Sequence, residues 1–204
     1  LEAVGYPVHR EYYVNDAGRQ MDILGASVWL RWLEANGVDI DFPQGGYRGE
    51  YIREIAAAID TSGIEPVTAG AVSEGLPENT ADNADAYVDA LVARCKELHG
   101  EAGFDRMRQQ ALESIRDEIR DDLEEFGVHF DEWFSEQSLT KANRVDDALA
   151  VLEERGMHYK KDGATWFPAT EFGDEKDRVV VRENGVKTYF ASDIAYHFDK
   201  RERG

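Results

Sequence analysis

Two short segments place side chains that could bind a ligand where a predicted strand turns into a predicted helix. The later one is Tyr189-Phe190-Ala191-Ser192-Asp193. Tyr189 and Asp193 are four residues apart, so a turn of the chain between them would let both face one pocket. A carboxylate there can accept two hydrogen bonds from a guanidinium, and a tyrosine offers its hydroxyl and ring face to the same cation.

Helix capping is the alternative role for this segment. Ser192 or Asp193 would then accept a backbone N–H at the start of a helix predicted from Ile194 to Arg201. Capping and ligand binding can coexist in one side chain. The residues alone favour capping.

The earlier segment is Asn15-Asp16-Ala17-Gly18, which follows a predicted strand at Arg10 to Val14. Its side-chain oxygens are also typical of a helix N-cap, and the residues alone favour that role. Ligands of open α/β sheets bind beyond the carboxyl ends of strands, where such turns gather. Both segments are therefore candidate sites.

Helical periodicity dominates the chain up to about residue 156. A helix from Gln20 to Ala35 is predicted to stop at Asn36-Gly37. A long connection spans residues 60–82. Four apolar stripes at helical spacing are predicted to be buried: Ile23, Leu24, Ser27, Val28 and Leu33; Tyr47, Tyr51, Ile52, Ile55 and Ile59; Ala84, Tyr87, Val88, Leu91, Val92, Cys95 and Leu98; and Met107, Ala111, Ile115, Ile119, Leu123 and Phe126.

The chain changes character after a shorter helix that ends at Gly156. Two Asp-Gly or Asn-Gly dipeptides, Asp162-Gly163 and Asn184-Gly185, favour tight hairpin turns. Strands are predicted around them, at 157–160, 164–168, 178–182 and 187–190.

Composition limits the class of protein. The chain has 204 residues, enough for one large domain or two small ones, and a net charge of −19, which argues against a free-standing nucleic-acid binder. No apolar run is long enough for a membrane-spanning helix. The single cysteine, Cys95, lies on an apolar stripe and is predicted to be a core thiol, and no metal site is predicted from the five scattered histidines. The acidic run from Asp117 to Glu125 is predicted to be a solvated helix face.

Five motifs, in one order along the chain, resemble a known family. They are Arg-Glu-Tyr-Tyr-Val-Asn-Asp-Ala-Gly-Arg-Gln at 10–20, Gly-Gly-Tyr-Arg-Gly-Glu-Tyr-Ile at 45–52, Phe-Asp-Glu-Trp-Phe-Ser-Glu at 130–136, Phe-Gly-Asp-Glu-Lys-Asp-Arg-Val at 172–179 and Thr-Tyr-Phe-Ala-Ser-Asp-Ile-Ala-Tyr-His at 188–197. Together they resemble arginyl-tRNA synthetase, a class I aminoacyl-tRNA synthetase, of the bacterial type. The resemblance covers nearly the whole chain.

The resemblance implies an α/β fold made of pieces of a Rossmann-like core with insertions. It divides the chain into a core strand and turn at 1–20, a helical insertion at 21–105, a core helix at 106–139, a hairpin-rich insertion at 140–187 and a return to the core at 188–204. It also implies that Tyr189 and Asp193 contact substrate arginine. For these two residues the resemblance favours ligand binding over capping. It leaves the roles of Asn15, Gln20 and His197 open.

The implied activity is that of an arginine–tRNA ligase, a cytoplasmic enzyme of translation. It activates L-arginine with ATP and Mg²⁺ and transfers it to tRNA(Arg). The family's ATP signature, His-x-Gly-His, and its Lys-Met-Ser-Lys-Ser-like loop are absent from these 204 residues. We therefore expect an internal fragment that is inactive alone, binds little tRNA and self-associates through cut sheet edges.

Two other readings stay open at this point. One is a non-catalytic acidic helical interaction module derived from a synthetase. The other is a class I synthetase for a different amino acid, in which Asp193 would have no guanidinium to bind.

Overall fold

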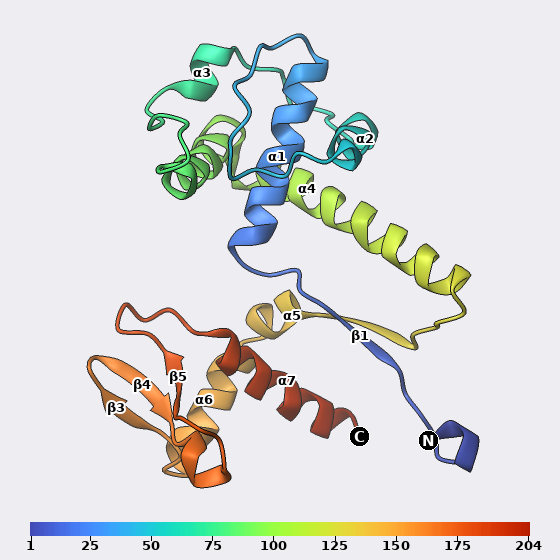
Figure 1. Ribbon diagram of the computed structural model, residues 1–204, viewed down its shortest axis with the longest axis vertical. Helices are drawn as coiled ribbons and strands as arrows, with labels where there is room; N and C mark the ends of the chain where they lie inside the picture. Colours follow the sequence, from blue (N-terminus) through green and yellow to red (C-terminus); the bar gives the residue numbers. More distant parts are fainter. The chain divides into compact units, whose positions relative to one another are not determined.

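The computed structural model describes residues 1–204 (Figure 1). Its internal contacts divide the chain into two compact units. Residues 16–129 form one of them, called here the helical unit, and residues 1–15 together with 130–204 form the other, called here the split unit. Each unit has a hydrophobic core of its own.

Helices make up the regular structure of the helical unit: α1 (Arg19–Ala35), α2 (Glu50–Ala58), α3 (Ala69–Ser73) and α4 (Ala84–Glu125). The predicted stripe of α1 is buried, and all the remaining residues between Ile23 and Leu33 are buried as well. That stretch includes Arg31, whose guanidinium pairs with Glu34 and lies 3.8 Å from the ring centroid of Phe42. The first helix is therefore a central helix and not an amphipathic surface helix.

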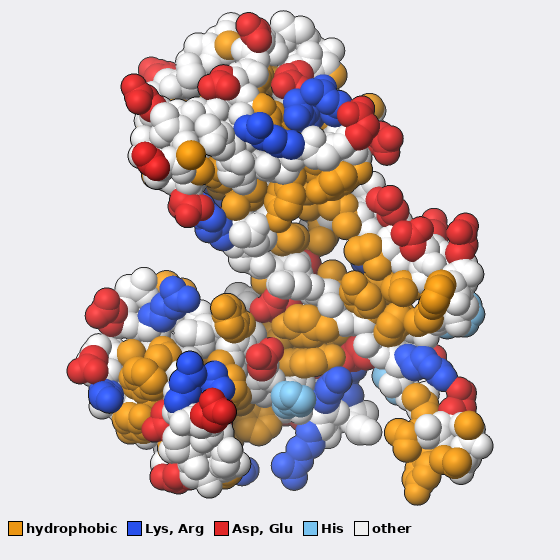
Figure 2. All heavy atoms as spheres, viewed as in Figure 1, with side chains coloured by type: hydrophobic (Ala, Val, Ile, Leu, Met, Phe, Trp, Pro, Cys, Tyr) orange, Lys and Arg blue, Asp and Glu red, His pale blue; other side chains and the backbone are white.

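The third and fourth predicted stripes lie on one element, α4, which is interrupted between them at Gly100. Gly100 has φ of 72°, a conformation that glycine adopts without a steric penalty. The stripe before the interruption is mostly buried, whereas the stripe after it becomes exposed toward its end, where Phe126 is 84% exposed. The acidic run at the end of α4 is solvated, as predicted, and Figure 2 shows acidic side chains gathered there.

The second predicted helix is shorter than its stripe suggested. Tyr47 lies outside α2, and its backbone N–H is bound by the Ser27 hydroxyl at 3.0 Å. The long connection at 60–82 is confirmed as mostly irregular chain, with α3 inside it. Thr68 caps α3 by accepting from the N–H of Ala71.

The split unit is organised around two parallel strands, β1 (Glu11–Val14) and β2 (Glu132–Ser135). They pair in register, with Tyr13 opposite Phe134. The core helix expected at 106–139 was wrong beyond Glu125, because Gly127, with φ of 82°, ends α4 and the chain then enters β2.

A small antiparallel sheet follows, made of β3 (Tyr159–Lys161), β4 (Ala164–Phe167) and β5 (Arg178–Val181). The predicted turn between β3 and β4 is confirmed, since Asp162 and Gly163 both have positive φ. Two short 3₁₀ segments, Glu2–Val4 and Ala169–Phe172, complete the irregular parts of this unit.

Three helices cover the split unit's core: α5 (Glu136–Lys141), α6 (Arg144–Glu154) and α7 (Tyr189–Arg203). The strand predicted at 187–190 was wrong. Lys187 makes only an isolated bridge to Val181, and the Thr188 hydroxyl donates to the carbonyl of Val179 at 2.6 Å. The chain therefore leaves the sheet at Thr188 and enters α7 one residue later. The core of this unit consists of Phe134, Leu139, Val145, Ala148, Val180, Ala191 and Ala195.

None of the helices combines the length and apolar character that crossing a membrane requires.

Candidate functional site

The carboxyl ends of β1 and β2 lie at one edge of the split unit, because the two strands are parallel. β2 ends at Ser135, whose hydroxyl accepts the N–H of Ser138 at 3.3 Å and so caps α5. Glu136 is therefore held in the first turn of α5. A carboxylate is stabilised there by the positive end of the helix dipole.

Helix α7 brings Asp193 close to Tyr13 at this edge, and Tyr189 lies one turn earlier in the same helix. Tyr189 and Asp193 are four residues apart in a helix, so they lie on one face of it. Ala191 and Ala195, on the other face, are buried in the core, while Tyr189 is 78% exposed and Asp193 is exposed. The helix begins at Tyr189 after an N-cap position at Thr188, so the capping role predicted for Ser192 or Asp193 was wrong.

Tyr13 links the strands to this helix. Its ring centroid lies 4.8 Å from that of Tyr196 on α7 and 6.0 Å from that of Phe134 on β2. Burial raises the pKa of the Tyr13 phenol, and so do the negative charges of Glu136 and Asp193 and a hydrogen bond to Glu136. The phenol therefore stays protonated and lies near both carboxylates.

Two carboxylates from different helices thus converge beside one phenol. A guanidinium presents five N–H donors in a planar fork, enough to bind both carboxylates at once. An ammonium group is a compact point charge and cannot match two separate acceptor pairs in this way. The arrangement of Glu136 and Asp193 is therefore suited to a guanidinium ligand, with the exposed ring of Tyr189 available beside Asp193.

Sequence reasoning proposed Asp193 and Tyr189 as arginine contacts, which stays a prediction, and it did not single out Glu136 and Tyr13, which the structure places near Asp193. Both missed residues lie inside motifs that carried the family resemblance, at the ends of strands that pair although they are far apart in the chain. No local pattern indicates this pairing. The position of Glu136 immediately after Phe-Ser, at a strand end, was the one signal that could have found it.

The three residues whose roles stayed open are not joined to this group. The Gln20 side chain accepts a hydrogen bond from the Tyr47 hydroxyl at 2.9 Å, within the helical unit. Asn15 and His197 are exposed. The N-cap of α1 is Gly18, so the capping role favoured for the Asn15 segment was also wrong.

A second group of carboxylates lies at the amino ends of β1 and β2. Atoms of His9, Glu11 and Glu132 lie within 4.8 Å of one another, which is a spacing compatible with metal ligands. However, Arg203 Nη1 lies 2.6 Å from an oxygen of both Glu11 and Glu132. A guanidinium therefore occupies the position between the two carboxylates, and the residues do not fit a metal ion.

Glu11 is the most strongly bound carboxylate of this second group, which we call the Arg203 cluster. Its side chain is only 4% exposed. Burial alone would raise its pKa, but hydrogen bonds from Arg203 and Tyr196 and the charges of Arg203 and Lys200 lower the pKa to about 2. The cluster joins the last turns of α7 to both parallel strands.

Cys95 is a core thiol, as predicted, and His99 has a structural role. Cys95 is fully buried, and burial raises the pKa of its thiol. His99 accepts a hydrogen bond from the indole N–H of Trp29 at 3.0 Å. Both residues belong to the helical unit, whereas the site at the end of the parallel strands belongs to the split unit.

Comparisons with known proteins show the family to which the chain belongs. The family model for the catalytic domain of class I tRNA synthetases specific for arginine matches residues 1–203. The arginine–tRNA ligase of Thioalkalivibrio sulfidiphilus is 55% identical over 208 residues, covering 100% of this chain and 36% of the ligase. That of Halorhodospira halophila is 54% identical over 206 residues, covering 100% and 35%.

A solved structure agrees. A crystal structure described as a putative arginyl-tRNA synthetase from Campylobacter jejuni is 30% identical to this chain and has a TM-score of 0.63, covering 100% of this chain and 38% of that one. The chain thus spans about a third of the length of the proteins it resembles. It belongs to the class I arginyl-tRNA synthetase family and corresponds to a part of that family's catalytic domain.

Proposed function

We propose that this chain supplies the arginine-binding part of an arginine–tRNA ligase. The whole enzyme would activate L-arginine with ATP and transfer it to tRNA(Arg). The observation that carries the proposal is the convergence of Glu136 and Asp193 on the Tyr13 phenol, at the edge where two parallel strands end. The alternative of a non-catalytic interaction module is not favoured, because the ligases match the chain over its full length.

Each residue of the group has a distinct role in this proposal. Asp193 accepts two N–H groups from one edge of the guanidinium. Glu136 accepts from another edge. Tyr13 donates to Glu136 and so fixes the direction of that carboxylate, while Tyr189 covers the cation with its ring and hydroxyl. Catalysis by the whole enzyme then depends on holding arginine so that its carboxylate meets the nucleotide.

ATP, Mg²⁺, tRNA and a cytoplasmic location enter the proposal through the family. No residue of this chain is assigned to the triphosphate, since the sequence contains neither His-x-Gly-His nor a Lys-Met-Ser-Lys-Ser-like loop. The 204-residue chain is accordingly expected to be inactive in aminoacylation when tested alone.

The same proposal assigns segments to core and insertions. Residues 1–20, 106–139 and 188–204 belong to the catalytic core, and residues 21–105 and 140–187 are its helical and hairpin-rich insertions. The parallel pairing of β1 with β2, and the contact of Tyr196 on α7 with both strands, support a common core for parts of these three segments.

A chimera tests the proposal directly. This chain replaces the aligned segment of the Thioalkalivibrio sulfidiphilus ligase, and arginine-dependent exchange between ATP and pyrophosphate is measured. Exchange that requires L-arginine, and that neither L-lysine nor L-citrulline supports, is the expected result. A well-folded chimera that shows no exchange with arginine, or that responds equally to lysine, would refute the assignment.

A further inference from the structure

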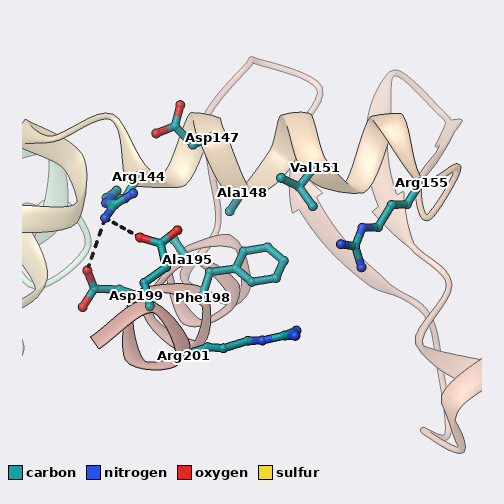
Figure 3. Close-up of a pocket in the computed structure, with 10 residues that line it drawn as sticks. Arg144, Asp147, Ala148, Val151, Arg155, Ala195, Phe198, Asp199 and Arg201 are labelled. Atoms are coloured by element: carbon teal, nitrogen blue, oxygen red, sulfur yellow. Dashed lines mark hydrogen bonds and ion pairs between the residues drawn. The ribbon is translucent and has the colours of Figure 1, made fainter. Parts of the chain in front are cut away.

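A groove between α6 and α7 is not used by the proposed arginine site. It has a volume of about 330 Å³ and is lined by residues of these two helices (Figure 3). The ring of Phe198 and the small apolar side chains of Ala148, Val151 and Ala195 form its floor. A groove of this size is at the lower end of the range for small-molecule sites.

The two ends of the groove differ in charge balance. At one end Arg144 is neutralised by Glu202 at 2.6 Å and by Asp199 at 3.9 Å. The other end holds two exposed arginines, Arg155 and Arg201, which form no ion pair or side-chain hydrogen bond. In a chain with 42 acidic and 23 basic residues, two such arginines lining one groove are unusual.

Helix ends explain part of this placement. Arg155 is the C-cap residue of α6, and Arg201 lies in the last turn of α7, where cations stabilise the helix dipole. That role needs only a positive charge near each helix end. It does not require both side chains to extend toward the same part of the groove beside the Phe198 ring, as they do in Figure 3.

We propose that this groove binds an organic phosphate, with the phosphate between Arg155 and Arg201 and the organic body on Phe198. A carboxylate has two oxygens and is satisfied by one guanidinium fork, whereas a phosphate offers three oxygens and up to two negative charges to two forks. An aromatic ring beside such a pair provides a stacking surface for a nucleobase. A nucleoside monophosphate combines both features.

Adenosine monophosphate is therefore the first probe, titrated into the ¹⁵N-labelled 204-residue chain at low salt and followed by NMR, including the arginine Nε–Hε signals. AMP is expected to shift the signals of Arg155, Arg201 and Phe198, while adenosine and inorganic phosphate bind more weakly. Because exposed charge pairs contribute up to about 1 kcal/mol, Arg155→Gln and Arg201→Gln are each expected to weaken AMP binding about fivefold.

Control variants separate this site from other effects. Arg182→Gln removes an exposed arginine of the same unit that has no ion pair and lies outside the groove, and it should leave AMP binding unchanged. Phe198→Leu should weaken AMP but not inorganic phosphate. Asp193→Asn should not affect AMP binding, so failure of the proposed arginine site and failure of this one are distinguishable.

The double variant Arg155→Gln/Arg201→Gln decides the question. Loss of AMP binding in a chain that unfolds at nearly the same urea concentration supports the site. Undetectable AMP binding by the unaltered chain, or unchanged affinity in the double variant, would overturn it and leave both arginines as helix-end cations. A hexamer of adenosine without terminal phosphates distinguishes the sources: binding at the same residues indicates an RNA strand, and binding of AMP alone indicates a free nucleotide.

Discussion

The carboxylates at the two ends of the β1–β2 pair have different partners. At the amino ends, Glu11 and Glu132 are bound by Arg203, and Lys200 and Tyr196 also reach Glu11. At the carboxyl ends, Asp193 makes no ion pair and lies with Glu136 beside a neutral phenol. The same helix, α7, contributes residues to both ends.

This difference separates structural from ligand-binding charge. In the Arg203 cluster the protein supplies the cation, and the lowered pKa of Glu11 shows how completely that carboxylate is satisfied. At the other end Asp193 has no ion pair within the protein, so its cation has to come from outside. A guanidinium ligand would do for Asp193 what Arg203 does for Glu11 and Glu132.

The largest expected effect comes from removing the acceptor that lacks an internal cation. Asp193→Asn in the chimeric ligase should lower kcat/KM for arginine about 100-fold to 1000-fold, because a desolvated charge pair truncated on one side costs about 3–4 kcal/mol. Glu154→Gln, at an exposed position at the end of α6, is the matched control and should stay near the unaltered value. Equal losses in both variants would contradict a ligand-binding role for Asp193.

Removal of Arg203, the cation of the Arg203 cluster, should lower the stability of the chain. Arg203→Gln leaves Glu11 buried without its main partner, so the free energy of unfolding should fall by about 3 kcal/mol, measured by urea denaturation with circular dichroism. Arg201→Gln removes an arginine of the same helix turn that has no ion pair, and the expected change is within about 0.5 kcal/mol. Similar changes for both would show that Arg203 acts only as a helix-end charge.

Acid should destabilise the Arg203 cluster in a defined range. The pKa of Glu11 is about 2 in the folded chain and 4.5 when unperturbed, so its contribution is present above pH 4.5 and is lost as the pH falls toward 2. We expect the chain to lose about 2 kcal/mol more of unfolding free energy between pH 5 and pH 2 than the Glu11→Gln variant does. Parallel pH profiles for the two proteins would contradict the assignment of this charge.

The smallest expected effect concerns the orientation of Glu136. Tyr13→Phe removes one hydroxyl that donates to Glu136 and keeps the ring packing against Tyr196. In the chimera the KM for arginine should rise about fivefold, corresponding to about 1 kcal/mol, with the KM for ATP unchanged. A matched rise in both KM values, or a fall in kcat alone, would assign Tyr13 a general structural role.

Local sequence patterns predicted many of the helices and turns, but they did not predict structure that depends on pairing between distant segments. The stripe on α1, the turn at Asp162-Gly163 and the solvated acidic face of α4 follow from spacing and turn chemistry, and all three were predicted. The strand β2 was missed because Glu132–Ser135 is short and gains its partner only from β1. The contact between Glu136 and Tyr13 could not be predicted for the same reason, because the pairing of β1 with β2 brings these two residues together.

The start of α7 shows a different limit. The run Lys187-Thr188-Tyr189-Phe190 has strong strand propensity, and it was predicted to be a strand. Hydrogen bonds from the Thr188 hydroxyl to the carbonyls of Val179 and Val180 accompany the exit from the sheet. Tyr189 and Asp193 nevertheless lie on one face, as predicted, because a spacing of four places two residues on one face of a helix as well as across a turn.

The pairing of β1 with β2 also has a consequence for the order of folding. Arg10 and Asp131 are hydrogen bonded although 121 residues separate them, and nearly all of that interval is the helical unit. Closing so long a loop of disordered chain costs entropy before any strand contact compensates for it, and such non-local pairing folds slowly. The helical unit is continuous in sequence and can form from local contacts. We therefore expect it to fold first and the proposed arginine site, which needs both strands, to assemble last.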